Sequence, residues 1–122
     1  MTKSAKSIPP KRGDVFLINF DPSVGSEIKK TRPAMVIQND IGNQYSPITI
    51  VAAITSQFEP PLYPTEVLIP AREGGLAVDS VTLLNQIRSV DKQRLIRRLG
   101  RVSPLTMRAI DQAIGVSLGL QG

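Results

Sequence analysis

An arginine and a threonine at the ends of two apolar runs are the residues of this chain whose types could do chemistry together. Arg32 stands where a polar loop meets an apolar strand, and Pro33 behind it limits the backbone. Thr55 closes the apolar run 48–54. A guanidinium offers a fork of donors that matches phosphate oxygens, and a hydroxyl can donate one more hydrogen bond. The pair therefore predicts a phosphate clamp.

Both residues also have an ordinary structural explanation. Most arginines form salt bridges or lie in solvent, and threonine is common at strand ends because it is β-branched. No rule of sequence spacing brings Arg32 and Thr55 together, so the clamp is a hypothesis that only the fold can test. Glu27, in the loop ahead of Arg32, could accept a proton or pair with a base edge, although a salt bridge to a neighbouring cation is favoured.

A phosphate clamp suits the cleavage of RNA, which carries its own nucleophile in the 2′-OH beside the scissile phosphate. Cleavage needs in-line geometry, stabilisation of charge on phosphorus and a proton for the leaving 5′ oxygen, and no metal is obligatory. Because arginine almost never loses its proton, we expect Arg32 to stabilise the transition state. The base is then Glu27, the substrate or water.

Composition narrows the chemistry further. At 122 residues the chain is one domain, and its net charge of +5 fits either an anionic partner such as nucleic acid or simply a soluble basic domain. The chain has no cysteine and no histidine. Disulfides, thiol nucleophiles and thiolate metal sites are excluded, as are the usual general base and the commonest metal ligand. Catalysis is left to Arg, Lys, carboxylates, hydroxyls and backbone donors.

Short apolar runs separated by turn formers predict a mainly β fold with a C-terminal helix, in the form of a small, strongly bent antiparallel barrel. Residues 1–10 read as a disordered basic tail, and residues 11–122 as one domain. We expect strands at 15–20, 34–38, 48–55, 65–69, 80–90 and 99–102, loops at 39–47 and 57–64, and a short helical turn at 92–96. Ser103 before Pro104 is a strong helix start. Apolar residues then recur at helical spacing: Met107, Ile110, Ala113, Ile114 and Leu118.

Two further segments bear on location and partners. The first ten residues have no apolar stretch typical of a signal peptide, and the run 48–54 is too short to cross a bilayer, so we expect a cytoplasmic protein with no membrane contact. A second basic cluster adjoins the C-terminal helix and is either a surface that follows phosphates or, more commonly, a solvated face. Its members are Lys92, Arg94, Arg97, Arg98 and Arg101.

Taken in order and spacing, several short motifs resemble the MazF/PemK family of type II toxins. The resemblance covers residues 11–120, and the motifs that carry it are Arg12-Gly13-Asp14-Val15, Asp21-Pro22, Gly25-Ser26-Glu27, Arg32-Pro33, Val36-Ile37-Gln38-Asn39-Asp40, Ile54-Thr55 and Leu83-Leu84-Asn85-Gln86-Ile87-Arg88.

The resemblance implies a homodimer of SH3-like barrels of the MazF/PemK/CcdB type and a metal-independent endoribonuclease without a cofactor. It would cut single-stranded RNA at short sequence motifs and leave 2′,3′-cyclic phosphate and 5′-OH ends. The partner implied is an antitoxin whose acidic, disordered segment folds over the RNA groove.

The resemblance also assigns roles to residues. The family's catalytic arginine and threonine fall on Arg32 and Thr55, and its RNA contacts fall on Ser26, Glu27 and Gln86. Lys29 and its neighbour Lys30 stand where relatives often have small, glycine-rich residues. We therefore expect Lys29 to bind phosphate, and the cleavage motif cannot be carried over from relatives.

Two alternatives remain open. A non-catalytic gyrase poison of the CcdB type shares the architecture but acts through a C-terminal tryptophan, and this chain has no tryptophan. An RNA-binding module without catalysis would use the same arginine and threonine to hold phosphate. Only an assay separates that module from a ribonuclease.

Overall fold

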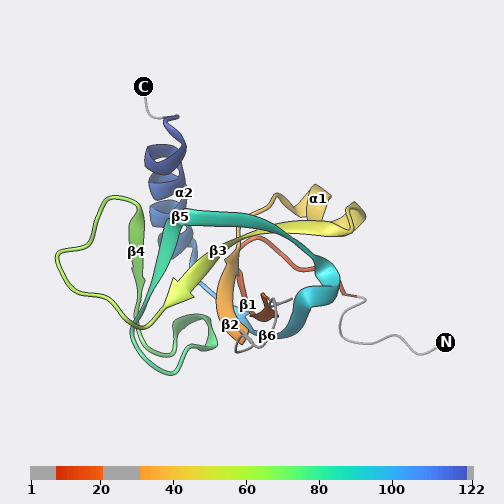
Figure 1. Cartoon of the computed structure of the whole chain (residues 1–122), viewed down its shortest axis with the longest axis horizontal. Helices are drawn as coiled ribbons and strands as arrows, with labels where there is room; N and C mark the ends of the chain where they lie inside the picture. The colour runs from red at the N-terminus through yellow and green to blue at the C-terminus, as the bar shows by residue number, and fades with distance from the viewer. Residues whose placement is uncertain (1–7, 21–30, 121–122) are drawn as a thin grey trace, which may run out of the picture.

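The computed structural model describes residues 8–20 and 31–120, which form one curled antiparallel sheet with a helix against it (Figure 1). The strands are β1 (Asp14–Asn19), β2 (Thr31–Val36), β3 (Ile48–Thr55), β4 (Glu66–Ile69), β5 (Ser80–Asp91) and β6 (Leu95–Arg101). The helices are α1 (Asp40–Tyr45) and α2 (Pro104–Leu118), with 3-10 turns η2 (Glu73–Gly75) and η3 (Lys92–Arg94).

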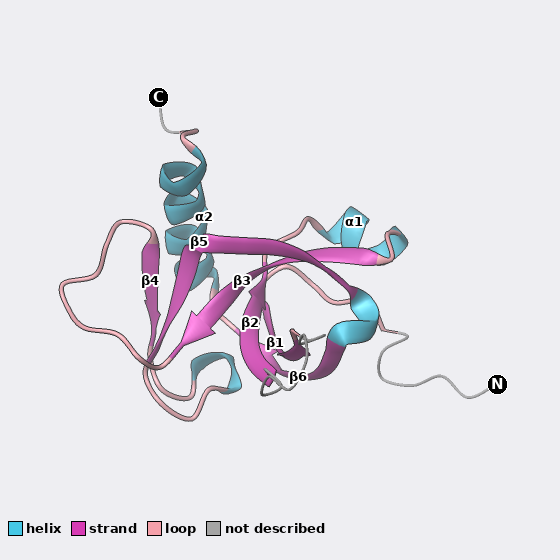
Figure 2. Cartoon of the chain, in the orientation of Figure 1, coloured by secondary structure: helices cyan, strands magenta, loops and turns pink. Residues whose placement is uncertain are grey.

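The six strands lie in the order β4-β5-β3-β2-β1-β6, and every neighbouring pair is antiparallel. Figure 2 shows the sheet curling so that the β1–β6 end lies under the long strand β5, with α2 beside the other end. The prediction of a mainly β, SH3-like barrel with a C-terminal helix is confirmed.

Alternating residues of the central strands belong to two apolar clusters, one on each face of the sheet. Val15, Met35 and Ile54 belong to the cluster that α2 covers. Ile18 and Val36 belong to the second cluster, against which Phe16 and Phe20 pack. The first strand therefore packs apolar side chains on both faces of the sheet.

The C-terminal helix begins as the sequence predicts. The Ser103 side chain accepts a hydrogen bond from the N–H of Thr106, and Pro104 occupies the first turn, where it needs no N–H donor. Ile110 and Ala113 are buried against the sheet. The predicted apolar face is wrong at its end, since Leu118 is 59% exposed.

Some boundaries differ from the sequence prediction. Residues 39–47 are not all loop, since α1 forms there with Asn39 as its N-cap. The buried Asn43 side chain fixes this helix by donating to the Gln38 carbonyl at 2.9 Å and accepting from the Thr49 hydroxyl at 2.7 Å. The last strand is longer than 99–102. It starts at Leu95, directly after the turn η3 that Asp91 caps.

Two other segments agree with the prediction. The proline-rich stretch 57–64 contains no strand, as expected. Within the described residues, none of the helices combines the length and the apolar character needed to cross a membrane.

Candidate active site

Arg32 lies at the start of β2, one residue before Pro33, and its side chain is exposed. It pairs with Ile18 of β1, which is completely buried. Proline has no N–H to donate and is accommodated near the beginning of a strand. The neighbouring strand thus fixes the backbone of Arg32, while its guanidinium group is left at the rim of the sheet.

The pairing of β2 with β3 brings Thr55 to the same rim. Ala34 pairs with Ala53 and Met35 with Ala52. Continued outward by two residues, this register sets Arg32 opposite Thr55, on the same face of the sheet. Arg32 and Thr55 both line one open pocket of about 370 Å³. The structure therefore brings together the two residues that sequence spacing could not connect.

A turn at the end of β3 orients the Thr55 hydroxyl. The backbone N–H of Gln57 donates to Thr55 Oγ1 at 3.0 Å, and the return contact from Oγ1 to the Gln57 carbonyl is long at 3.5 Å. A hydroxyl that accepts from the backbone keeps its own proton to donate. The hydroxyl can thus present a donor toward an anion in the pocket.

The opposite wall of the pocket comes from the loop before β5, which sequence reasoning did not connect with the site. Its lining residues are Leu76, Ala77, Val78 and Ser80. Two hydrogen bonds close this loop: Ala71 N–H donates to the Asp79 carboxylate at 2.8 Å, and Arg72 N–H donates to the Leu76 carbonyl at 2.6 Å. Gly74 and Gly75 are turn formers and fit a loop here, but nothing in the sequence pattern shows which strand ends this loop would face.

The other predicted site residues stand apart or are not described. Ser26, Glu27 and Lys29 lie outside the described residues. Gln86 is exposed on β5, in a bulge between the pairs Ala53–Leu83 and Ala52–Ile87. Gln86 does not belong to the described lining of the Arg32 pocket. The described residues thus join Arg32 with Thr55 but not with Gln86.

The described part of the pocket carries one cation and no carboxylate among its lining residues. Elsewhere in residues 8–20 and 31–120, no three His, Cys, Asp or Glu side chains converge as they would around a metal ion. What the arrangement offers is a guanidinium, hydroxyl groups and an apolar wall. This combination can hold a phosphate group and stabilise negative charge on it.

The second basic cluster makes more contacts than a solvated face would. Lys92 Nζ donates to the Asn43 carbonyl, and Arg94 donates to the Asn19 carbonyl at 3.2 Å. Arg98 and Arg101 pair with Asp14. These cations tie η3 and β6 to the rest of the barrel.

Comparisons with known proteins agree with this fold. Residues 11–118 match the family described as PemK-like, MazF-like toxin of type II toxin–antitoxin system. The chain belongs to this family. Endoribonuclease EndoA of Bacillus subtilis is 49% identical over 110 residues, which cover 90% of this chain and 95% of that protein.

Solved structures extend the likeness to the fold. The MazE–MazF complex of Deinococcus radiodurans (Form-II) matches with a TM-score of 0.80 and 27% identity, covering 93% of this chain and 99% of that chain. An endoribonuclease in complex with its cognate antitoxin from Mycobacterial species matches with a TM-score of 0.76 and 23% identity, covering 93% and 98%. At that identity the second likeness concerns the fold alone.

Proposed function

We propose that this protein is the toxin of a type II toxin–antitoxin pair and a metal-independent endoribonuclease that cuts single-stranded RNA, including mRNA, at short sequence motifs and so arrests translation and growth. The observation that carries the proposal is the β2–β3 register, which sets Arg32 across from Thr55 in one open pocket. Membership of the PemK-like, MazF-like family and 49% identity to Endoribonuclease EndoA support it.

In the proposed reaction the 2′-OH attacks the adjacent phosphorus. A bond forms between the 2′ oxygen and phosphorus, and the bond from phosphorus to the 5′ oxygen breaks, which leaves a 2′,3′-cyclic phosphate and a 5′-OH. Arg32 binds the phosphate oxygens and offsets their added negative charge, and Thr55 donates a further hydrogen bond. The 2′-OH gives up its proton to a group other than Arg32, because a guanidinium stays protonated.

The proposal has a cellular setting as well. It includes a homodimer, a cytoplasmic location and an antitoxin partner that neutralises the toxin. The antitoxin is supported by membership of a toxin–antitoxin family and by the MazE–MazF complex, a relative at 27% identity. Ser26, Glu27, Lys29 and Gln86 are proposed as RNA contacts, with Glu27 a candidate for the proton acceptor.

The test is to incubate the purified protein with a long single-stranded RNA in the presence of EDTA and to map the 5′ ends of the products. We expect discrete cuts with 5′-OH ends. In Arg32→Ala the rate of cleavage should fall by a factor of about 10² or more, because the positive charge that faces the phosphate is removed. Arg108→Ala, which removes an exposed arginine of α2, is the matched control and should cut like the wild type. Near-normal cleavage by a folded Arg32→Ala protein would show that Arg32 is not part of the site. If the wild type cleaved none of several RNAs, a non-catalytic toxin or an RNA-binding module would be favoured.

A further inference from the structure

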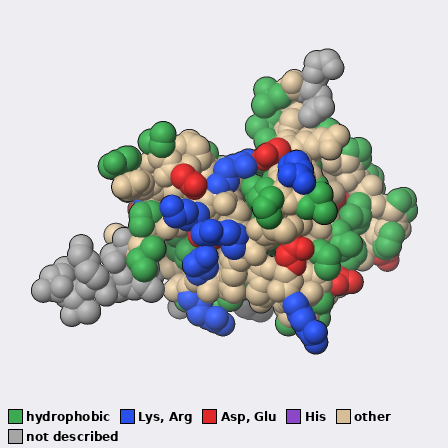
Figure 3. Space-filling view, turned by 180° about the vertical axis from the view of Figure 1, so that it is seen from behind, with side chains coloured by type: hydrophobic (Ala, Val, Ile, Leu, Met, Phe, Trp, Pro, Cys, Tyr) green, Lys and Arg blue, Asp and Glu red, His purple; other side chains and the backbone are tan. Residues whose placement is uncertain are grey.

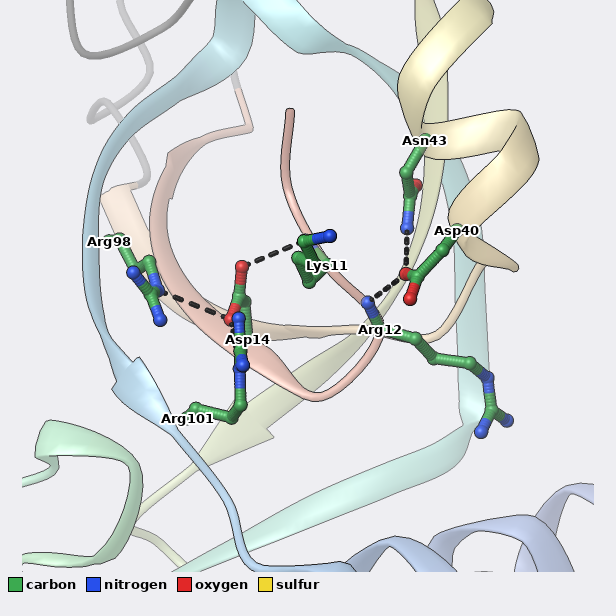
Figure 4. A network of polar contacts seen from close by, with 7 residues as sticks. All are labelled: Lys11, Arg12, Asp14, Asp40, Asn43, Arg98 and Arg101. Atoms are coloured by element: carbon green, nitrogen blue, oxygen red, sulfur yellow. Dashed lines mark hydrogen bonds and ion pairs between the residues drawn. The ribbon is translucent and has the colours of Figure 1, made fainter. Parts of the chain in front are cut away.

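A buried carboxylate lies at the start of β1, outside the lining of the Arg32 pocket. Asp14 is only 1% exposed. Its Oδ2 accepts a hydrogen bond from the backbone N–H of Lys11 at 2.8 Å. Its Oδ1 accepts from Arg98 Nε at 3.2 Å and from Arg101 Nε at 2.9 Å. Figure 4 shows the two arginines reaching from β6 toward this one oxygen.

Two guanidinium groups thus share one carboxylate oxygen. A single carboxylate neutralises one of them, so the cluster of Asp14, Arg98 and Arg101 keeps a net positive charge. The two guanidinium groups, lying this close, repel each other. Both arginine side chains remain about half exposed, at 50% and 48%. Among the described residues, Arg98 and Arg101 contact Asp14 through Nε alone, so this carboxylate leaves their outer nitrogens available for another ligand. The geometry favours a second anion.

A pocket of about 440 Å³ lies directly over this pair, which is enough for a ligand the size of a nucleotide. Part of its lining is apolar, from Ile8, Pro9, Pro10, Phe16, Leu95 and Ile96. The rest is charged and includes Lys11, Lys92 and Arg97 beside the arginine pair. Figure 3 shows Lys and Arg side chains gathered on one face of the molecule.

This arginine pocket (the site of Arg98 and Arg101) is close to the Arg32 pocket. Ile18 of β1 pairs with Arg32 on one side and with Leu95, which lines the arginine pocket, on the other. Neighbouring strands lie about 5 Å apart, so the backbones of Arg32 and Leu95 are separated by about 10 Å. One extended strand of RNA could therefore reach both pockets.

We propose that Arg98 and Arg101 bind a phosphate group of a single-stranded RNA, as a second contact outside the pocket of Arg32 and Thr55. The inference rests on the proposed function and extends it to a longer stretch of substrate. Guanidinium forks match phosphate oxygens, and the apolar lining can receive the attached nucleoside. The distance to Arg32 favours RNA over an unrelated acidic peptide.

The test measures binding of a long single-stranded RNA by fluorescence anisotropy over a range of salt, in the Arg32→Ala background so that the RNA is not cut. Arg98→Gln and Arg101→Gln each leave one arginine on Asp14, so the carboxylate stays paired. We expect each change to weaken binding about fivefold or more and to lower the slope of log K against log salt by about 0.7, the value for one phosphate contact on a single strand. Arg108→Gln, with the same change of charge on α2, should change neither.

An NMR titration covers the case in which these variants fold poorly. In the Arg32→Ala protein with Arg98 and Arg101 otherwise intact, the Nε–H signals of both should shift on addition of RNA. Unmoved signals, or unchanged affinity and salt slope in both folded variants, would overturn the proposal. If inorganic phosphate or uridine monophosphate bound as tightly as RNA, the ligand would be a free anion and the proposal would also be overturned. The same holds if binding of polyglutamate required Arg98 and binding of RNA did not.

The outcome is separable from that of the proposed function. If the wild type cut no RNA but bound it in a way that depends on Arg98 and Arg101, RNA binding at the arginine pocket would be supported and the proposed ribonuclease activity would be rejected. If the wild type cut RNA and its RNA binding did not change when either arginine was replaced, the ribonuclease activity would be supported and the arginine-pocket proposal rejected.

Discussion

At the scale of single residues, the candidate site depends on how a hydroxyl is held. Thr55 ends β3, where its backbone pairs with Val81 of β5, and the N–H of Gln57 orients its side chain by donating to Oγ1. A local turn of this kind lowers the rotational freedom of the side chain before any ligand arrives. For Arg32, the pairing of β2 with β1 fixes the backbone.

Thr55→Val tests the role of this hydroxyl. Valine keeps the β-branched shape that suits a strand end and removes the donor, so folding should be retained while RNA cleavage falls about 10²-fold. Thr55→Ser keeps the hydroxyl and should retain most of the activity. Single-turnover cleavage, with circular dichroism as the control for folding, checks both. Loss of activity in Thr55→Ser with activity retained in Thr55→Val would show that the methyl group, not the hydroxyl, matters.

At the scale of elements, one carboxylate fastens α2 to the loop that faces the candidate site. Glu73 lies in η2 and accepts hydrogen bonds from the Ser103 N–H at 3.1 Å and from the Thr106 hydroxyl. Burial on its own raises the pKa of Glu73, but the hydrogen bond from Thr106 and those from Ser103 outweigh it and hold the pKa below the ordinary 4.5. The charged form is therefore the one that the fold prefers.

Glu73→Gln should show this preference as a dependence of stability on pH. Because the folded pKa is lowered, the contribution of Glu73 is fully present above the ordinary value of about 4.5 and is lost as pH falls through the folded value. Urea unfolding at about pH 7 and about pH 3 measures it. We expect the wild type to be more stable than the variant at the higher pH and this difference to shrink at the lower one. A constant difference would mean that the effect of the substitution is not electrostatic.

The same loop lies against β6 with no room for a side chain. Gly75 has φ +75°, and a Cβ there would stand 2.0 Å from the Leu99 carbonyl oxygen. Gly119, at the end of α2, has a similar φ of +72°, but no described residue other than its neighbours along the chain comes within 4 Å of a Cβ placed there. The two glycines therefore separate backbone strain from steric overlap.

We expect Gly119→Ala to cost about 1 kcal/mol of unfolding free energy, from the left-handed backbone alone. Gly75→Ala should cost about 3 kcal/mol or more, since the loop must also move away from β6. Urea denaturation gives both values. Equal costs would show that the loop yields easily, and the wall of the Arg32 pocket would then be softer than its contacts indicate.

At the scale of the whole molecule, the sequence predicted the helices and strands better than the contacts between them. A continuous apolar run predicted the strand 48–55 to the residue, because burial on two faces removes the alternation of apolar and polar residues, and Ser103-Pro104 predicted the start of α2. The short helix α1 was missed because it depends on tertiary contacts of Asn43 rather than on its own propensity. Arg32 and Thr55 come together only through the β2–β3 register, which is set by long-range pairing.

The bulge in β5 has a consequence for how the molecule unfolds. β3 pairs with β5 on both sides of the bulge and places Ile54 in one apolar cluster and Val51 in the other. Neither cluster can therefore open while the other keeps its strands, and we expect a single cooperative unit. Native-state hydrogen exchange should give the amides of Ile54 and Val51 the same opening free energy, equal to that of global unfolding. Two distinct values would divide the domain into separately opening halves, with the candidate active site at the end of only one of them.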